Sequence, residues 1–456
     1  MSAVFEAAPV FSMRQDSLLP PDDPLRQTLH NEVHARPSAS LKLPVVVHYV
    51  AVLNEGVARA DEHAHLCRLP GQEALPPEAL GANFLRLNFE GFSVKWERHT
   101  EFTRYSVVQA LPEGLDATPE SLDALPPAVT ADWLRDVPGR TFAALKLVLL
   151  EQHLGSPGKV VADARTWFDD SPIVASVMGA VQGQGHSVVV TDFQLRPTGW
   201  EHMVVIAEHA TSETRAGRIA QRLLEIETYR LMALRALPVA KALGPLLGRV
   251  EAGLASITER LHQRDTSADA LLDELIALAA RVEHLTAEHQ YRFNATEAYH
   301  ALVQNRIAEL HEGKSGAAQT LGEFMQRRLS PAMATVALTA QRLTDLSRRI
   351  ERASALLRTR VDIATDLRSQ ALLTQLSEGQ STQLRMQATV EGLSIAAITY
   401  YVVSLLLYVF KALKLQGWWP LSPELSAGIA IPLVLAGVWW TTRRIHRRFF
   451  GHGPAA

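Results

Sequence analysis

The sequence predicts an α+β cytoplasmic domain, then an all-α helical domain with a long stalk helix, and finally a two-helix C-terminal transmembrane hairpin. Three observations predict this fold class. Short β-branched and alternating runs fill the first 208 residues, strand patterns stop there, and two uncharged runs of membrane length lie near the C-terminus. The expected domains are 1–208 (α+β), 209–315 (helical), 316–392 (stalk helix), 393–442 (transmembrane hairpin) and 443–456 (basic cytoplasmic tail).

Strand signals recur throughout the first domain. Residues 43–53 form a β-branched run that predicts a buried strand, and Glu90-Gly91 and Pro197-Thr198-Gly199 predict hairpin turns between alternating runs. Residues 141–150 are apolar enough for either a strand or a buried helix. The other expected strands, mostly antiparallel to their neighbours, are 83–90, 92–97, 103–110, 187–195 and 200–208.

Helical periodicity dominates after residue 210. Residues 211–237 form an amphipathic pattern that Pro238 interrupts, and further helices are expected up to about residue 261, from 268 to about 314, and from 320 onward. In the last of these, apolar residues recur at spacings of three and four and lie on one helix face. A bundle helix and a self-associating coiled-coil stalk fit this stripe equally well. The stripe comprises Leu343, Leu346, Ile350, Ala353, Leu357, Val361, Ala364, Leu367 and Ala371.

The two apolar runs are predicted to cross a membrane. Residues 393–410 and 425–442 are each 18 residues long and uncharged. A helix of that length spans roughly 27 Å, close to the thickness of a hydrocarbon core. Tryptophans at the ends of the runs are typical of membrane interfaces. Four arginines follow the second run, and this positive charge indicates that the basic tail and the N-terminus are cytoplasmic. No signal peptide is visible in the first 11 residues.

Composition narrows the class of protein. A net charge of −3 makes nucleic acid an unexpected partner, and a single cysteine, Cys67, excludes disulfides within the chain. The sequence has no nucleotide-binding glycine loop, no nucleophile elbow and no paired-cysteine metal motif. These observations lean against an enzyme and leave any cofactor unknown.

Two polar segments form the candidate functional site. His30 and His34 would share a helix face, but the order His-Asn-Glu-x-His departs from the metalloprotease motif His-Glu-x-x-His. A buried network, in which the first segment hydrogen-bonds the second, is therefore favoured over a metal or catalytic site. No metal ligand or catalytic residue is assigned. The candidate polar site comprises Asn31, Glu32, His34, Arg36, Trp96, Glu97, Arg98 and His99.

Two other charged clusters have structural interpretations. The residues Asp61, Glu62, His63, His65 and Cys67 would fan out around a helix and predict a solvated surface helix, because they cannot converge on one ion. A second, denser cluster on one helix predicts interdomain salt bridges rather than catalysis. It comprises Arg218, Arg222, Glu225, Glu227 and Arg230.

The first apolar run carries hydroxyl groups along one face. This face either packs against small residues of the second run or lines a pore in an assembly of several chains. The face comprises Ser394, Ala397, Tyr401, Ser404 and Tyr408, and the small residues opposite would be Gly428, Pro432 and Ala436. Neither run contains an acidic residue, so no cation site is predicted within them.

Several stretches resemble a bacterial family of uncharacterised membrane-anchored proteins, a domain of unknown function with the signature NEVHARP. They lie at 31–37 (NEVHARP), 96–102 (WERHTEF), 217–238, 357–361 and 389–401. The resemblance covers almost the whole chain. It implies full-length membership and a location in the bacterial inner membrane, and it carries no established activity.

The order of segments also resembles the plan of CorA-type magnesium transporters. Those proteins carry Gly-Met-Asn after the first span, whereas this loop reads KALKLQGWWPLSPE, so the resemblance does not imply magnesium selectivity. The leading hypothesis is a membrane-anchored homo-oligomer, such as a CorA-like channel or transporter, whose partners are the lipid bilayer and further copies of the chain. The alternative is a membrane-tethered enzyme or ligand-sensing protein with its site between the NEVHARP and WERHTEF segments. The transported ion or substrate, the subunit number and the physiological role are not predicted.

Overall fold

A computed structural model describes residues 23–26, 29–30, 40–112, 118, 121, 124–168, 171–179, 185–263, 267–417 and 420–450. The chain divides into two compact units, Met1–Arg352 and Ala353–Ala456. A sheet-rich α+β region comes first and a long helical region follows it, as the sequence predicts. The predicted domain boundaries at residues 208 and 315 stay predictions. One apolar core, which includes Tyr49, Leu223 and Leu321, contains residues on both sides of each boundary.

One sheet organises the first unit. In the described part of the chain its nine strands follow the order β2-β3-β4-β1-β5-β8-β7-β6-β9, and neighbouring strands are antiparallel except β5 with β8. All nine residues of β1 are buried, because β4 and β5 pair with its two edges and apolar cores cover both faces of the sheet there. The strands are β1 Val45–Leu53, β2 Phe84–Asn88, β3 Phe92–Arg98, β4 Phe102–Ala110, β5 Arg140–Glu151, β6 Val174–Met178, β7 Ser187–Thr191, β8 Glu201–Ala207 and β9 Gly313–Lys314.

Both predicted hairpins are confirmed. Gly91 joins β2 to β3 with a φ of 82°, a conformation that glycine adopts without steric strain. Gly199 has a φ of 85° in the turn between β7 and β8. The apolar run that fitted a strand or a buried helix is the strand β5, at the centre of the sheet.

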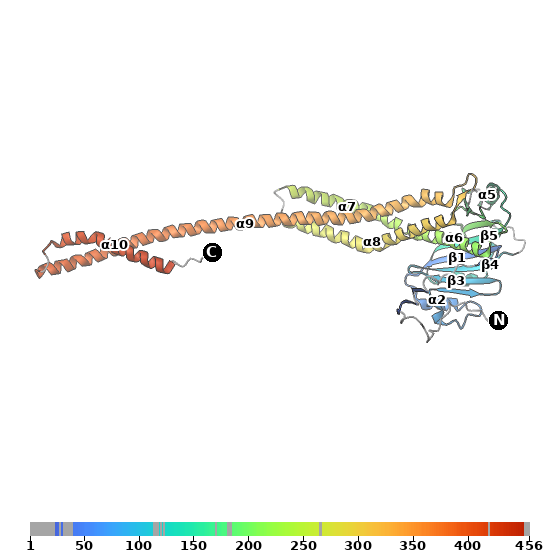
Figure 1. Cartoon of the computed structure of the whole chain (residues 1–456), viewed down its shortest axis with the longest axis horizontal. Coiled ribbons are helices and arrows are strands. Elements are labelled where there is room, and N and C mark those ends of the chain that lie inside the picture. The colour runs from blue at the N-terminus through green and yellow to red at the C-terminus, as the bar shows by residue number, and fades with distance from the viewer. Residues whose placement is uncertain are drawn as a thin grey trace. The chain divides into compact units, whose positions relative to one another are not determined.

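Helices cover the sheet and extend from it (Figure 1). The helix α6 and the chain after it share a core with one face of the sheet, to which α8 contributes Val303 and α9 contributes Leu329. A second core contains Trp96 and Leu66 of α2, and a third contains Val161 of α5. The helices are α2 Arg59–Leu66, α4 Ala131–Arg135, α5 Pro157–Arg165, α6 Glu213–Leu234, α7 Ala236–His262, α8 Ala268–Leu310, α9 Leu321–Leu415 and α10 Pro423–Phe450, with 3-10 turns η1 Pro77–Leu80 and η2 Thr166–Phe168.

The start of α9 is fixed to the edge of the sheet. The carboxylate of Glu312 accepts hydrogen bonds from Ser176 Oγ of β6 at 2.8 Å, from Thr320 Oγ1 at 3.0 Å and from the Gly322 amide at 2.9 Å. The Leu321 amide donates to Ser176 Oγ at 2.8 Å. A carboxylate at this position satisfies free amide groups and complements the positive end of the helix dipole. These contacts therefore fix the first turn of α9 against β6.

The predicted stripe on α9 changes its environment partway along the helix. Its members from Leu343 to Leu357 are buried, and Arg342 beside them pairs with Glu251 of α7 at 2.8 Å. Further along, Leu367 is 61% exposed, and Ala364 and Ala371 are exposed too. The bundle interpretation therefore describes the first half of the stripe, and the second half is left without a partner within the described chain.

Three helical segments are long and apolar enough to cross a membrane by length and composition. They are Glu213–Leu261, Leu321–Leu415 and Pro423–Arg444. In the first segment 33% of the most apolar window is buried inside the protein, against 6% and 11% in the other two. The first segment is a core element, whereas the apolar surfaces of the last two, at the predicted spans, face outward.

Candidate functional site

The WERHTEF segment forms the end of β3, the turn after it and the start of β4. Successive side chains of a strand point to opposite faces of a sheet. Trp96 is fully buried in the core beneath α2, where it lies opposite Tyr105 of β4. Glu97 points to the other face and is 2% exposed. The segment therefore contributes both to an apolar core and to a polar site.

Glu97 is the centre of a buried ion cluster. Its carboxylate lies 3.1 Å from Lys95 Nζ and 3.0 Å from Arg104 Nη2, and Arg104 is only 3% exposed. Burial alone would raise the pKa of Glu97, but Arg104 and Lys95 lower it to about 2. Burial also acts against the charged form of Arg104, but Glu97 outweighs it and raises the pKa of Arg104. Both side chains are therefore charged at neutral pH.

The cluster continues from the sheet into the helices. Arg104 Nη1 lies 4.0 Å from Glu225 of α6, and Glu225 also pairs with Arg306 of α8. Glu309 then joins the two helices, because it lies 2.6 Å from Arg306 Nη1 and 3.0 Å from Arg222 Nε. Alternating charges thus connect β3, β4, α6 and α8. The sequence predicts interdomain salt bridges for this face of α6. Glu225 lies near Arg104 across the predicted boundary at residue 208, whereas Arg222 pairs with Glu309 inside the same predicted helical domain.

On the opposite face of the sheet, Arg98 is fixed by a second buried carboxylate. Glu62 of α2 lies 2.6 Å from Arg98 Nη1 and accepts a 2.6 Å hydrogen bond from Thr103 Oγ1. The prediction of a solvated surface helix is wrong for Glu62 and His65, which are 0% and 3% exposed. Partners on β3 and β4 compensate Glu62, and Trp133 stacks on His65 at 4.4 Å. Burial lowers the pKa of His65 to about 4, with a further contribution from Arg68, so this side chain is neutral at pH 7.

The turn between β3 and β4 is held by α8. Glu101 pairs with Arg292 and accepts a 2.8 Å hydrogen bond from the hydroxyl of Tyr299. His99 stacks on Phe102, with ring centroids 4.5 Å apart. The position of this turn relative to the helices is therefore fixed by ionic and aromatic contacts.

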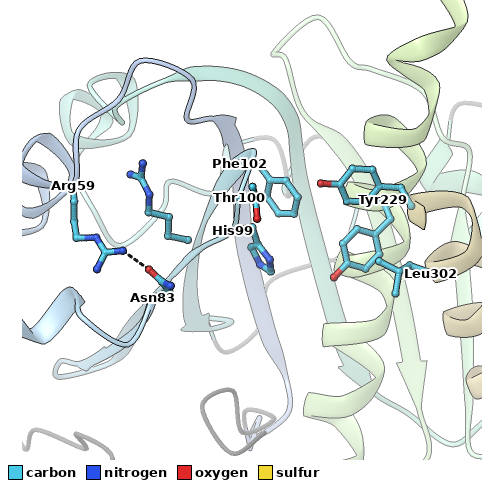
Figure 2. Close-up of a pocket in the computed structure, with 9 residues that line it drawn as sticks. Arg59, Asn83, His99, Thr100, Phe102, Tyr229 and Leu302 are labelled. Atoms are coloured by element: carbon cyan, nitrogen blue, oxygen red, sulfur yellow. Dashed lines mark hydrogen bonds between the residues drawn. The ribbon is translucent and has the colours of Figure 1, made fainter. Parts of the chain in front are cut away.

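A cavity of about 450 Å³ lies beside this turn (Figure 2). Figure 2 shows Arg59 and Asn83 on one side and Tyr229 and Leu302 on the other, with the His99 ring between them. No carboxylate lines the cavity in the described part of the chain. The lining residues are Arg59, Asn83, Arg98, His99, Thr100, Phe102, Tyr229, Tyr299 and Leu302.

The sequence-predicted site is only partly described. Asn31, Glu32, His34 and Arg36 lie outside the described residues, so their hydrogen bonding to the WERHTEF segment stays a prediction. Arg98 and His99 line the cavity, whereas Trp96 and Glu97 do not. Among the residues that the structure describes, no group of three or more His, Cys, Asp or Glu could hold a metal ion.

Sequence reasoning missed Arg59, Arg104, Tyr229 and Arg306. Arg104 carries the one usable signal, because it is the only charged residue in the strand pattern at 102–110. Such a residue requires a buried partner. The partner's identity depends on the fold, since Glu225 is far away in the sequence.

The predicted hydroxyl face of the first apolar run is not covered by the second run. Tyr401 and Tyr408 are 67% and 70% exposed, Ser394 and Ala397 are exposed, and Ser404 is half-buried. The opposing residues Gly428, Pro432 and Ala436 are exposed as well. The structure buries Thr399 of α9 and Ala427 of α10 instead. The packing interpretation of this face is therefore not supported within one chain, and pore lining stays a prediction.

A second carboxylate cluster lies between β8 and α6. Arg230 Nη2 lies 3.2 Å from Glu201 and 2.5 Å from Glu227, and both carboxylates are largely buried. Burial, and then the charge of Glu227, raise the pKa of Glu201 to about 8. One arginine cannot fully compensate two buried carboxylates, so Glu201 retains a proton near neutral pH.

This cluster predicts a pH-dependent stability. The pKa of Glu201 is about 8 in the folded chain against the ordinary 4.5, so its contribution to stability is complete below pH 4.5 and is lost as the pH rises through 8. We expect Glu201→Gln to remove this loss and to be more stable than the wild type by roughly 1–2 kcal/mol at pH 9. Urea denaturation of both proteins at pH 5, 7 and 9 measures the difference. Parallel pH profiles for the two proteins would contradict the assignment.

These features define a class: a sheet-and-helix body followed by a long helix that ends in an apolar hairpin. The chain belongs to the family described as "Protein of unknown function (DUF3422)", which matches residues 21–449. Searches of curated proteins and of solved structures found no match.

Proposed function

We propose that the chain is the subunit of a homo-oligomeric, CorA-like channel or transporter of the bacterial inner membrane. In this proposal α9 and α10 cross the bilayer, and both termini lie in the cytoplasm. One observation carries it: α9 is a single helix, Leu321–Leu415, that begins on the sheet and includes the first apolar run. A continuous helix of this kind can join a folded body to a pore.

The apolar surface of the two runs supports the membrane location. Large side chains such as Leu393, Leu405 and Leu433 are 66–72% exposed. Transfer of such a side chain from water to an apolar medium is favourable by about 1.5–3 kcal/mol. At the end of α10, the guanidinium groups of Arg443 and Arg444 lie 4.5 and 5.0 Å from the ring centroids of Trp439 and Trp440. Paired cationic and aromatic side chains are typical of a membrane interface.

The exposed part of α9 before the first run supports self-association. Ile363 and Leu367 lie one turn apart on the same helix face and are 56% and 61% exposed, although they precede the proposed span. Lipid cannot cover them there, and isolated long helices rarely expose such an apolar face to water. A second copy of α9 offers a matching surface, because identical helices present identical stripes.

Assembly would bring the hydroxyl face of several α9 helices together. Tyr401 and Tyr408, which are exposed on this face, would line a polar passage without fixed charge. Magnesium selectivity is not part of the proposal, because the loop between the runs lacks Gly-Met-Asn.

The mass of the full-length protein in lipid nanodiscs tests the proposal. We expect native mass spectrometry to give one defined oligomer, and fluorescence assays to give ion flux after reconstitution into vesicles. Tyr401→Ala is expected to change the flux severalfold. The matched control is Tyr400→Ala, since Tyr400 is equally exposed but lies on a neighbouring face. A monomer, or equal effects of the two substitutions, would contradict the proposal.

A second candidate function is a membrane-tethered enzyme or ligand-sensing protein whose site lies between the NEVHARP and WERHTEF segments. The observation that favours ligand sensing is the cavity that Arg98 and His99 line. Its walls come from the sheet and from both α6 and α8, so a bound ligand would contact elements that the ion cluster also connects.

A further inference from the structure

We propose that the cavity beside the β3–β4 turn binds a small anion that carries a phosphate or carboxylate group. The inference rests on the second candidate function, the ligand-sensing protein, and names the ligand class of its site. The cavity lining includes two arginines and a histidine and no carboxylate in the described part of the chain. A concave surface with this charge attracts anions.

Arg59 supplies a cation without a countercharge. Its guanidinium donates to the Leu80 carbonyl at 3.0 Å and to Asn83 Oδ1 at 2.5 Å, and both acceptors are neutral. No carboxylate pairs with Arg59 among the described residues. The two hydrogen bonds fix the orientation of the side chain and leave its full charge to the cavity, an arrangement that favours bidentate binding of an oxyanion.

The backbone at Asn83 supports a binding role. Asn83 has a φ of 56°, in the left-handed region that few side chains other than asparagine and glycine adopt. This conformation lets the Asn83 carbonyl accept from the Arg98 amide at 2.9 Å while its side chain accepts from Arg59. One residue thus positions the two arginines that line the cavity.

Tyr229 on the opposite wall provides an independent indication. Its side chain is 8% exposed and lines the cavity, and its hydroxyl donates no hydrogen bond to another described residue. A hydroxyl in this position can donate to a ligand. Burial raises the pKa of this hydroxyl, so it remains protonated and can donate to an anion. The hydroxyl of the neighbouring Tyr299 already donates a hydrogen bond to Glu101.

Arg98 completes the site as a fixed cation. Glu62 balances its charge from the far side, and the Val57 carbonyl accepts from Nη2 at 3.0 Å. The unbalanced charge of the cavity therefore comes from Arg59, and the geometry points to a ligand with one strongly anionic group. A volume of about 450 Å³ leaves room for an organic group attached to it.

Calorimetric titration of the full-length protein in detergent tests the proposal. The probes are inorganic phosphate, glycerol phosphate and citrate, which separate a free anion, a phosphate ester and a carboxylate as sources of the charge. We expect at least one probe to bind. Arg59→Gln should then weaken binding about tenfold or more, and Tyr229→Phe about threefold to tenfold.

Arg68→Gln is the matched control. Arg68 follows α2, pairs with Asp136 at 2.9 Å and does not line the cavity. This substitution changes the net charge as Arg59→Gln does, and it should leave binding unchanged. Because Arg59 is exposed, its substitution should not alter the circular dichroism spectrum or the melting temperature.

The outcomes of these measurements test the anion site separately from the ligand-sensing and channel functions. Absence of binding by all three probes, or equal weakening by Arg68→Gln, would overturn the anion site. Binding that depends on Arg59 supports the site. If such binding leaves ion flux and oligomer mass unchanged, the site stands and the ligand-sensing function is overturned. The proposed channel is judged separately, by the mass and the flux without added ligand.

Discussion

Glu97→Gln is expected to destabilise the protein by about 3–5 kcal/mol, the usual effect of removing one member of a buried ion pair. The substitution keeps the size of the side chain and removes its charge. Arg104 would retain a buried positive charge, and the half-buried Lys95 would lose its ion-pair partner. Glu225 can compensate little, because it lies 4.0 Å from Arg104 and already pairs with Arg306. Chemical denaturation followed by circular dichroism measures the loss.

Asp132→Asn is the control for this substitution. Asp132 pairs with Arg135 at 2.7 Å, but the two side chains are 77% and 73% exposed. Exposed pairs contribute less than about 1 kcal/mol, so this variant should be close to the wild type. Equal stabilities of the two variants would refute the central position of Glu97 in the cluster.

The free energy of unfolding at acidic pH provides a second test of Glu97. The folded pKa of Glu97 is about 2 and lies below the ordinary 4.5, so its contribution is present above pH 4.5 and is lost as the pH falls through 2. The wild type should lose stability in this window more steeply than Glu97→Gln. If the variant instead folds normally and loses only anion binding, Glu97 belongs to a ligand site and not to a structural network.

Local signals in the sequence predict the elements but not their order in the sheet. The turns at Gly91 and Gly199 are visible because a tight hairpin needs a residue with positive φ. The parallel pairing of β5 with β8 has no local signal, since a crossover connects them. The two-residue strand β9 is equally hidden, because its pairing with β6 is a consequence of where α8 ends.

The candidate site was predictable only where its signal is local. The WERHTEF segment is a dense run of polar side chains between two strand patterns, and this pattern indicates a polar site. Its partners Glu62, Glu225 and Tyr299 reach it only through the fold. Glu62 shows the limit most clearly: its place on a short charged helix predicts a surface residue, yet Arg98 and Thr103 make its complete burial tolerable.

The stripe on α9 illustrates a limit of periodicity. Spacings of three and four establish that one face of a helix is apolar, and they do not say what covers it. In this chain the same stripe is buried at Leu357 and exposed at Leu367. A truncation between these two residues can therefore separate the folded body from the surfaces that the proposal assigns to self-association and to lipid.

A chain that ends at Arg360 is expected to be monomeric and to remain in solution without detergent. The last buried residue of the stripe is Leu357, so this truncation keeps the three apolar cores around the sheet and removes the exposed leucines that follow. The full-length chain should require detergent, because it retains both 18-residue uncharged runs. Size-exclusion chromatography with light scattering measures both properties, and circular dichroism checks the fold.

An intermediate chain that ends at Gly392 shows whether self-association depends on the exposed leucines of α9 or on the predicted spans. It keeps the exposed leucines of α9 and lacks the predicted spans, so we expect it to stay soluble and to self-associate as its concentration rises. If it is monomeric at all concentrations, self-association requires the spans, and the stalk interface is wrong. If the full-length chain is itself soluble and monodisperse without detergent, the apolar hairpin is covered by protein, and the membrane location fails with it.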